Sequence, residues 1–233
     1  MWMTTNRNVF GFRRDNKMSK AIEEYEKYMK TTQHSHEEKA FDRYDVFLEI
    51  TKHFSVKKAL YPGSYIHITP SLIIPEVIYV DNVKKAKEFF KNKSEILEYV
   101  EKKKIYKEKT IIKFESMDYW NDLPIPKDYN DLLISQYAGF VSQACKQYLR
   151  KGGILLANDS HGDATLAKLD SDFDFIGVLE YGNGNYHFKT ENLDQFFTFK
   201  RERPIDISKV KKTMKGPKYK TTSEYYLFEK RTV

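Results

Sequence analysis

The stretch ALYPGSYIHITPSLIIPEVIYVDN, residues 59–82, joins two apolar runs by a tight turn. Residues 59–61 lead into Pro62-Gly63-Ser64, and the run from Val77 to Val80 ends at Asp81-Asn82. Two short buried strands, one followed by a glycine turn and the other by a carboxylate, are typical of nucleoside-binding α/β folds. Such folds carry several glycines in the first turn, so that backbone can touch the ligand, and this turn has one. The stretch predicts the scaffold of a nucleoside-binding α/β fold and leaves open whether a nucleoside still binds.

Composition indicates a globular protein with one sizeable core. The chain has 233 residues, of which 40% are hydrophobic and 15% aromatic. No run of about 18 apolar residues is present, and the N-terminal residues lack the apolar centre of a secretory signal. A single cysteine, Cys145, allows no intrachain disulfide and no cysteine cluster for zinc, and it is expected in the core. These features favour a cytoplasmic protein without membrane association.

The formal net charge of +7 is moderate and, along the sequence, looks dispersed. Local basic density occurs at Lys102–Lys104 and in the lysine-rich stretch 209–220 (KVKKTMKGPKYK). A solvated lysine-rich surface explains both. A patch facing a polyanion is the alternative, because neutralising phosphates requires clustered lysine or arginine. The charge alone does not decide the partner.

Two amphipathic helices are expected at the N-terminus. Apolar side chains recur at helical spacing in residues 18–32 and again in residues 37–54. We therefore predict an N-terminal helical extension over residues 1–55, packed on a main domain of residues 56–233. The polar break between the helices carries His34 and His36, which are expected in a solvated turn rather than at a metal.

From residue 57 the pattern changes to alternating strands and helices. Strands are expected near 58–61, 76–81, 110–115, 131–136 and 154–157, with helices between them, the last of which includes residues 140–151. Near-continuous apolar strands separated by helices favour a parallel sheet covered on both faces. Residues 174–181 and 224–231 form two further strand patterns without a crossover helix, which favours an antiparallel pair.

Four segments carry a resemblance to a known family: YPGSYIHITPS, VIYVDN, LLISQYAGF and GGILLANDSHGDA. On these, residues 56–231 resemble the class I S-adenosylmethionine-dependent methyltransferase superfamily, and most closely a prokaryotic branch of it. The resemblance implies a three-layer Rossmann-like α/β fold, mostly parallel, with an antiparallel C-terminal strand, here preceded by two N-terminal helices. It also implies a methyltransferase with S-adenosylmethionine as cofactor.

The candidate cofactor residues follow the first three strands. Gly63 and Ser64 form the turn beneath the cofactor, where glycine allows positive φ and close backbone approach. Asp81, with Asn82 beside it, ends the second strand, where a carboxylate accepts the ribose hydroxyls; capping the next helix is the alternative. The resemblance implies that Asp118, in FESMDYW, holds the adenine amino group.

The candidate catalytic residues lie at the same edge. The catalytic candidate Tyr137 lies at the end of the fourth strand with Gln136 and with Ser135, which is a candidate cofactor-binding residue; the resemblance implies that the methyl group lies here. The absence of an Asp/Asn-Pro-Pro-Tyr/Phe motif argues against amino methylation of bases. His161 is a candidate general base because its ordinary pKa lies near neutrality. A capping and turn role for its polar segment, including Asp163, is equally economical. No residue is assigned to a metal.

Three functions remain open at this point. The first is a methyltransferase with an unknown acceptor, for which a small molecule is slightly favoured and nucleic acid is the alternative. The second is a degenerate, non-catalytic binding protein on the same fold, contacting nucleic acid through the lysine-rich C-terminal loop. The third is a nicotinamide-dependent dehydrogenase, which Asp81 would also suit but which the glycine-poor turn disfavours.

Overall fold

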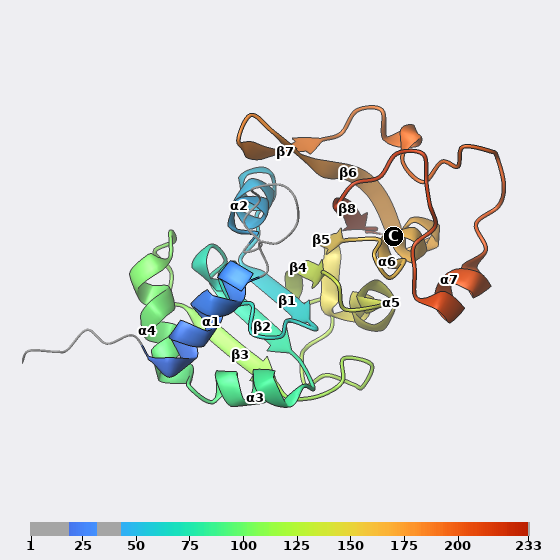
Figure 1. Ribbon diagram of the computed structural model, residues 1–233. Helices are drawn as coiled ribbons and strands as arrows, with labels where there is room; N and C mark the ends of the chain where they lie inside the picture. The colour runs from blue at the N-terminus through green and yellow to red at the C-terminus, as the bar shows by residue number, and fades with distance from the viewer. Residues whose placement is uncertain (1–18, 32–42, 233) are drawn as a thin grey trace, which may run out of the picture.

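The computed structural model describes residues 19–31 and 43–232, and these fold around one mixed sheet (Figure 1). The strand order is β3-β2-β1-β4-β5-β8-β6-β7. The strands are β1 Lys58–Pro62, β2 Glu76–Val80, β3 Ile111–Glu115, β4 Asn130–Ser135, β5 Leu149–Ala157, β6 Phe173–Gly182, β7 Asn185–Lys189 and β8 Tyr225–Lys230. The first five are parallel to one another, and β8 is antiparallel to both of its neighbours.

Two hydrophobic clusters lie on opposite faces of the sheet, so the architecture has three layers. Alternate side chains of each strand point to opposite faces, and in β1 Ala59 and Tyr61 join one cluster while Leu60 joins the other. The first cluster takes in α1 Lys20–Thr31, α2 Tyr44–His53, α3 Lys84–Phe90 and α4 Lys93–Lys103. The second takes in α5 Val141–Cys145 and α6 Asp163–Leu169. The three-layer Rossmann-like α/β fold predicted from the sequence is confirmed.

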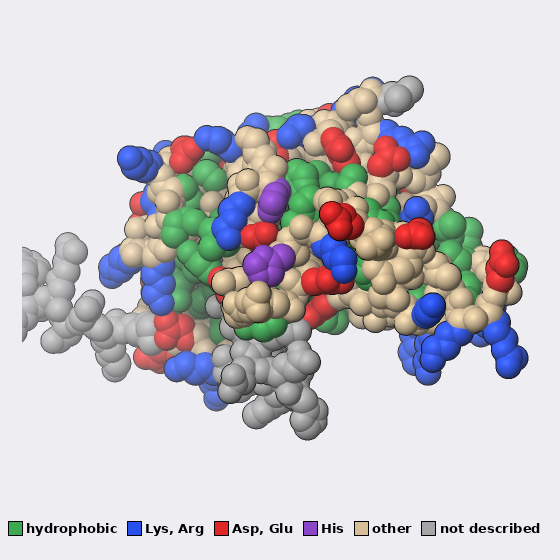
Figure 2. All heavy atoms as spheres, turned by 90° about the horizontal axis from the view of Figure 1, so that it is seen from above, with side chains coloured by type: hydrophobic (Ala, Val, Ile, Leu, Met, Phe, Trp, Pro, Cys, Tyr) green, Lys and Arg blue, Asp and Glu red, His purple; other side chains and the backbone are tan. Residues whose placement is uncertain are grey.

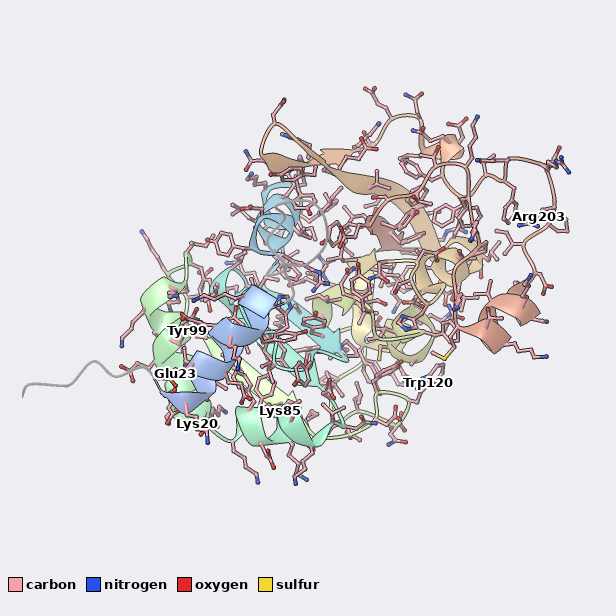
Figure 3. All side chains as sticks on the ribbon, in the orientation of Figure 1. Lys20, Glu23, Lys85, Tyr99, Trp120 and Arg203 are labelled. Atoms are coloured by element: carbon pink, nitrogen blue, oxygen red, sulfur yellow. The ribbon has the colours of Figure 1, made fainter. Side chains whose placement is uncertain are left out.

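The two N-terminal helices contribute to the same core as the sheet. On α1, Tyr25 packs edge-on against Tyr99 of α4, and its hydroxyl lies 2.7 Å from Thr69 Oγ1. Lys85 of α3 forms an ion pair with Glu24 of α1, and Figure 3 shows Lys85 and Tyr99 beside this helix. On α2, Glu49 accepts a hydrogen bond from the Phe188 amide of β7 at 3.1 Å. Residues 1–18 and 32–42, which include His34 and His36, lie outside the described residues.

The helix expected over residues 140–151 is shorter than predicted. It ends at Cys145, a 3₁₀ turn covers Lys146–Tyr148, and β5 begins at Leu149. Leu149 pairs with Asn130 of β4, and the register then shifts so that Leu132 pairs with Ile154. Pairing with β4 therefore takes Arg150 and Lys151 into the strand, although their charge and the following glycines are typical of a helix end.

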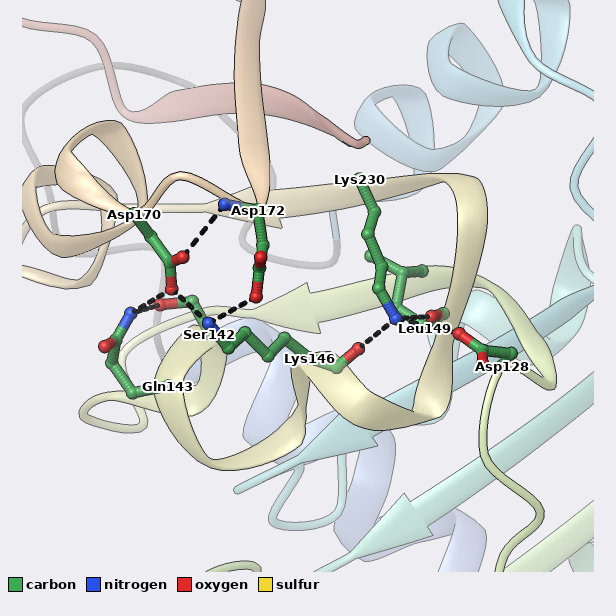
Figure 4. A network of polar contacts seen from close by, with 8 residues as sticks. All are labelled: Asp128, Ser142, Gln143, Lys146, Leu149, Asp170, Asp172 and Lys230. Atoms are coloured by element: carbon green, nitrogen blue, oxygen red, sulfur yellow. Dashed lines mark hydrogen bonds and ion pairs between the residues drawn. The ribbon is translucent and has the colours of Figure 1, made fainter. Parts of the chain in front are cut away.

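The C-terminal strand is antiparallel as predicted, but it lies inside the sheet, between β5 and β6. The hairpin of β6 and β7, turning at residues 182–185, forms the outer edge, and the sequence analysis did not anticipate β7. Lys230 anchors the strand: its ammonium donates to Asp128 Oδ1 at 2.8 Å and to the carbonyls of Lys146 and Leu149 at 2.9 and 2.6 Å (Figure 4). No described helix is both long and apolar enough to cross a membrane.

Candidate functional site

The turn after β1 has the conformation that its glycine allows. Gly63 has φ +64°, and its amide donates to the Val80 carbonyl at 2.8 Å, which ties the turn to the end of β2. A Cβ on Gly63 would overlap the Cβ of Ala138, in the loop after β4. Ser64 is buried, and its hydroxyl is directed to the Tyr65 carbonyl at 3.5 Å. The β4–α5 loop therefore lies directly on the backbone that a cofactor would approach.

Asp81 links the ends of β1 and β2. It is 8% exposed; its Oδ2 accepts the Tyr65 amide at 2.8 Å, and its Oδ1 accepts the Val83 amide at 2.9 Å. The second bond closes a turn before α3, whose N-cap is Val83 and has no side-chain cap hydrogen bond, so Asp81 does not cap the helix as the alternative role supposed. A carboxylate has about four lone-pair sites, so two remain for further donors. The geometry thus leaves room for ribose binding at Asp81.

The two aromatic residues that replace the missing glycines have different positions. His67 is buried, with its Nδ1 3.1 Å from the Tyr61 hydroxyl and its ring against Phe47, so it belongs to the core. Tyr65 has φ +49° and packs edge-on against Tyr28 of α1, with ring centroids 5.0 Å apart. The ring of Tyr65 therefore forms part of a wall with α1.

A buried guanidinium is present near this wall. Arg43, at the start of α2, is 4% exposed, and its Cζ lies 5.2 Å from the ring centroid of Tyr137. Burial by itself lowers the pKa of Arg43, yet the nearby Tyr61, Tyr225 and Glu224 raise it above its ordinary value overall. Arg43 is therefore a cation at every physiological pH.

The phenols around Arg43 are neutral. Burial raises the pKa of Tyr61 to about 12 and moves the pKa of Tyr225 well above its ordinary range. Tyr137, with φ +58°, donates its hydroxyl to Glu224 Oε1 at 3.1 Å, and burial and that carboxylate raise its pKa as well. A neutral phenol donates hydrogen bonds and does not act as a base, so the structure places Tyr137 as a donor.

Ser135, at the end of β4, contacts the buried carboxylate of Asp163. Its hydroxyl donates to Asp163 Oδ2 at 2.5 Å, and Ser142 donates its hydroxyl to Oδ1 at 2.6 Å and its amide to Oδ2 at 3.0 Å. Burial raises the pKa of Asp163 to about 6, although these hydrogen bonds act in the opposite direction. Asp163 therefore joins β4, α5 and α6, and the hydroxyl of Ser135 is one of the donors that hold these three elements together.

Gln136, the residue that follows β4, has a side-chain donor of fixed orientation. Asn158 Oδ1 accepts from the Ser160 amide and hydroxyl at 3.3 and 2.8 Å, so Asn158 Nδ2 is the group that donates to Gln136 Oε1, at 3.3 Å. The side-chain nitrogen of Gln136 is then directed away from Asn158, is buried, and has no hydrogen-bond partner within residues 19–31 and 43–232. An unsatisfied buried donor costs about 1–3 kcal/mol, so it is a group that a ligand can use.

The loop after β5 carries His161 and Asp159. His161 is half-buried, and its Nδ1 lies 3.1 Å from the Ser160 hydroxyl. Asp159 accepts the amide and hydroxyl of Thr165 at 2.7 and 2.8 Å, and burial raises its pKa to about 6. Of these two side chains, Asp159 is the one held by hydrogen bonds to another element, and that element is α6 and not β1.

The remaining candidate residues are at the surface. Asp118 is exposed and its Oδ1 accepts the Trp120 amide at 3.0 Å, while Asn82 is exposed beside Asp81. The neighbouring Tyr119 donates its hydroxyl to the Ala138 carbonyl, which brings the loop after β3 against the loop after β4. In the described part of the chain, no group of three or more His, Cys, Asp or Glu side chains is arranged to hold a metal ion.

No family model matches the sequence, and no curated protein matches it. Solved structures resemble it. A protein of Methanococcus maripaludis, assigned as an S-adenosyl-L-methionine-dependent methyltransferase, is 16% identical with a TM-score of 0.47, over 100% of this chain and 98% of that one. A protein of Klebsiella pneumoniae, assigned as an O-methyltransferase, is 8% identical with a TM-score of 0.48, over 92% and 91%. The Bacillus cereus O-methyltransferase, solved with S-adenosylhomocysteine, is 10% identical with a TM-score of 0.45, over 75% and 90%.

At these identities and TM-scores nothing about a reaction follows, and the strand order is the stronger observation. The order β3-β2-β1-β4-β5 is that of a doubly wound nucleoside-binding sheet. A dinucleotide fold continues in parallel, whereas the C-terminal strand β8 is antiparallel, as the family resemblance implies. The chain has the class I methyltransferase fold.

In such an open α/β sheet the ligand crevice lies outside the carboxyl ends of the strands, where the order reverses between β1 and β4. The structure brings Gly63, Asp81 and Tyr137 to that edge and directs Ser135 to Asp163. The hydrogen bonds of Asp118 and His161 are local, to Trp120 and Ser160, two and one positions away. Sequence reasoning did not single out the residues that reach the edge from the N-terminal helices and from the position before β8, namely Tyr28, Arg43 and Glu224. Their distances along the chain gave no indication of this meeting.

Proposed function

We propose that the protein is an S-adenosylmethionine-dependent methyltransferase whose cofactor lies along the carboxyl ends of β1 and β2. The observation that carries the proposal is that two buried charged groups lie at the same edge of the sheet, the carboxylate of Asp81 and the guanidinium of Arg43. The cofactor has a ribose diol at its centre and a carboxylate at its amino-acid end. A carboxylate suits the diol, and a desolvated guanidinium suits the carboxylate.

The other residues have roles consistent with this placement. Asp118 and Tyr119 are near the adenine end, and Gln136, Tyr137 and His161 are on the acceptor side. Methyl transfer needs alignment of a nucleophile with the methyl group and, for a protonated acceptor, removal of a proton. We assign the side-chain donor of Gln136 to binding the acceptor, place Tyr137, whose hydroxyl is donated to Glu224, beside it, and keep His161 as the candidate base.

One contact opposes cofactor binding in the present conformation. Ala138 lies against Gly63, so the β4–α5 loop has to move before a ligand can touch the turn. That loop contains two residues with positive φ, Tyr137 and Gly139, which suits a segment that rearranges. If the loop does not move, the fold serves as a non-catalytic binding module, which is the second candidate function.

Calorimetry with S-adenosylmethionine, S-adenosylhomocysteine and NAD separates these functions. We expect micromolar binding of S-adenosylhomocysteine and a loss of about 2–3 kcal/mol, roughly 30- to 150-fold, in Asp81→Ala, because hydrogen bonds to a charged group contribute about 1.5–3 kcal/mol each and do not add fully. Arg43→Met should weaken binding of the amino-acid end of the cofactor while leaving the binding of adenosine unchanged.

Asp131→Ala is the matched control. Asp131 Oδ2 also accepts two backbone amides, those of Lys57 and Lys58, each at 2.9 Å, but at the amino end of β1. Equal losses in the Asp81 and Asp131 variants would mean that Asp81 acts through stability alone. No binding of any of the three ligands, after carried-over ligand has been excluded, would support the binding module, and preferential binding of NAD would support a dehydrogenase.

A further inference from the structure

The net charge of the protein is concentrated in one segment, which we call the basic strap, residues 199–220. It contains nine of the 40 basic residues and two of the 33 acidic residues, which leaves 31 of each sign in the rest of the chain. The strap therefore carries a net +7, equal to the formal charge of the whole protein. The sequence-based expectation of a dispersed charge was wrong.

The cations of the strap are exposed, and they are not engaged in ion pairs. All nine basic side chains are exposed, and within the described ranges none of them forms a salt bridge. Lysines of the parallel half behave differently: Lys57 pairs with Glu108, and Lys113 pairs with Glu76. Like charges that lie close together without acidic partners repel one another, and binding an external anion would relieve this repulsion.

The strap is held in place by packing, which corrects the expectation of a plain loop. It includes α7, Ile207–Thr213, whose first turn is capped by Asp206 accepting the Lys209 amide at 2.9 Å. Val210 is buried against Gly162, and Gly216 lies on Asp159. The cations are therefore presented on an ordered frame, beside the loop that follows β5.

Two neighbouring hollows open on the strap, with volumes of about 460 and 530 Å³. Phe199, Arg203 and Lys218 line both. The lining of the first includes the apolar side chains of Pro204, Val210 and Pro217 and the lysines Lys209 and Lys215. Figure 3 shows Arg203 at the far end of the molecule from α1, and Figure 2 shows Lys and Arg side chains gathered at the end that carries α7.

We propose that the basic strap binds single-stranded nucleic acid. Nine cations exceed what one phosphate group requires and suit a chain of phosphates. Hollows with apolar and aromatic side chains in their lining accept the faces of unpaired bases, which a duplex keeps stacked inside. The guanidinium of Arg203 lies over the ring of Phe199, with its Cζ 4.3 Å from the ring centroid, and adds a planar cation to this surface. A lipid surface would use apolar side chains that project outward, and the strap exposes two, Ile207 and Met214. A flat surface cannot fill the two hollows, however, so their presence favours the single strand. The proposal is independent of cofactor binding at Asp81.

Fluorescence anisotropy with a labelled 12-nucleotide single strand of mixed sequence, as RNA and as DNA, tests the proposal. In the variant Arg203→Ala/Lys209→Ala/Lys215→Ala/Lys218→Ala we expect affinity at least tenfold weaker. We also expect the slope of log K against log salt to become shallower by about 0.7 for each phosphate that is no longer neutralised, up to about 3. These side chains are exposed and unpaired, so the variant should fold, which circular dichroism and thermal unfolding will verify.

The control variant Lys20→Ala/Lys107→Ala/Lys109→Ala/Lys127→Ala removes the same charge from exposed lysines elsewhere. Retained affinity in the control, with weaker binding in the strap variant, supports the proposal. Equal weakening in both variants would reduce the effect to net charge and overturn it. So would binding of the matching duplex, of a mononucleotide, or of phosphatidylserine vesicles as tight as that of the single strand.

Discussion

The parallel half of the molecule and its C-terminal part use charge in opposite ways. Around β1–β5 the polar groups are buried and engaged: Asp81 accepts two amides, and Asp163 accepts hydrogen bonds from Ser135 and Ser142. In the C-terminal part the basic strap holds its cations in solvent without acidic partners. Buried polar groups must be satisfied by the fold, whereas exposed charges contribute little to stability and remain available for ligands.

This difference separates two kinds of recognition. The buried edge, with one carboxylate, one guanidinium and neutral phenols, suits a small zwitterionic ligand. The strap suits an extended anion. The following predictions test whether stability depends on the first region and not on the second.

The largest effect is expected at Gly63. The change Gly63→Ala forces a left-handed backbone on alanine and overlaps Ala138, so the free energy of unfolding should fall by about 2–5 kcal/mol in urea denaturation. The double variant Gly63→Ala/Ala138→Gly should recover the part due to overlap and retain a destabilisation of about 1–2 kcal/mol. If the double variant is no more stable than Gly63→Ala, the two loops do not pack as described.

Asp159 should make the protein less stable as the pH rises. Its ordinary pKa of 3.8 is raised to about 6 by burial, so between these values the folded state binds more protons than the unfolded state. The contribution of Asp159 to the free energy of unfolding is therefore greatest below its unfolded pKa, and it decreases by about 3 kcal/mol in total as the pH rises through the folded pKa of about 6.

The variant Asp159→Asn isolates this effect. Its amide can still accept the Thr165 amide and can donate to the Thr165 hydroxyl, so the local structure should persist. We expect the difference in unfolding free energy between variant and wild type to change by about 2 kcal/mol between pH 4 and 6, which is the larger part of that total. A constant difference across this range would mean that Asp159 does not titrate there.

A smaller loss of stability is expected when the anchor of β8 at Lys230 is removed. The change Lys230→Met keeps the apolar stem and removes the ammonium donor from the carbonyls of Lys146 and Leu149, so the free energy of unfolding should fall by about 2 kcal/mol. The exposed Lys151, which donates to the Thr232 carbonyl at 3.2 Å, gives the matched control Lys151→Met, with a change below about 0.5 kcal/mol. Equal effects of the two changes would contradict the anchoring role.

The smallest effect is expected in the strap. Replacing Lys211, Lys212, Lys215 and Lys218 by alanine should change the unfolding free energy by less than about 0.5 kcal/mol, because these exposed side chains form no ion pair within the described residues. A decrease above about 1 kcal/mol would show that the strap is part of the structural framework after all.

The sequence determined most of the parallel half. Alternation of apolar strands with amphipathic helices fixed β1 to β5 to within one or two residues, except where β5 begins, and the break at Gly63 marked the turn. These features are local, because hydrophobic periodicity and turn residues act over a few positions. The helix end predicted at Arg150-Lys151 was wrong because pairing with β4, a contact across the sheet, outweighed local helix-stop residues.

The candidate site divides in the same way. Position along the chain, read with the family resemblance, was enough to select Gly63, Asp81 and Tyr137. Only the tertiary structure brought Arg43 beside Tyr137, packed Ala138 against Gly63, and formed the hydrogen bond from Ser135 to Asp163. Each of these contacts joins residues that are 28 to 94 positions apart along the chain. Local preferences set which strands and helices form, whereas the burial of polar groups depends on which distant segments the fold brings together.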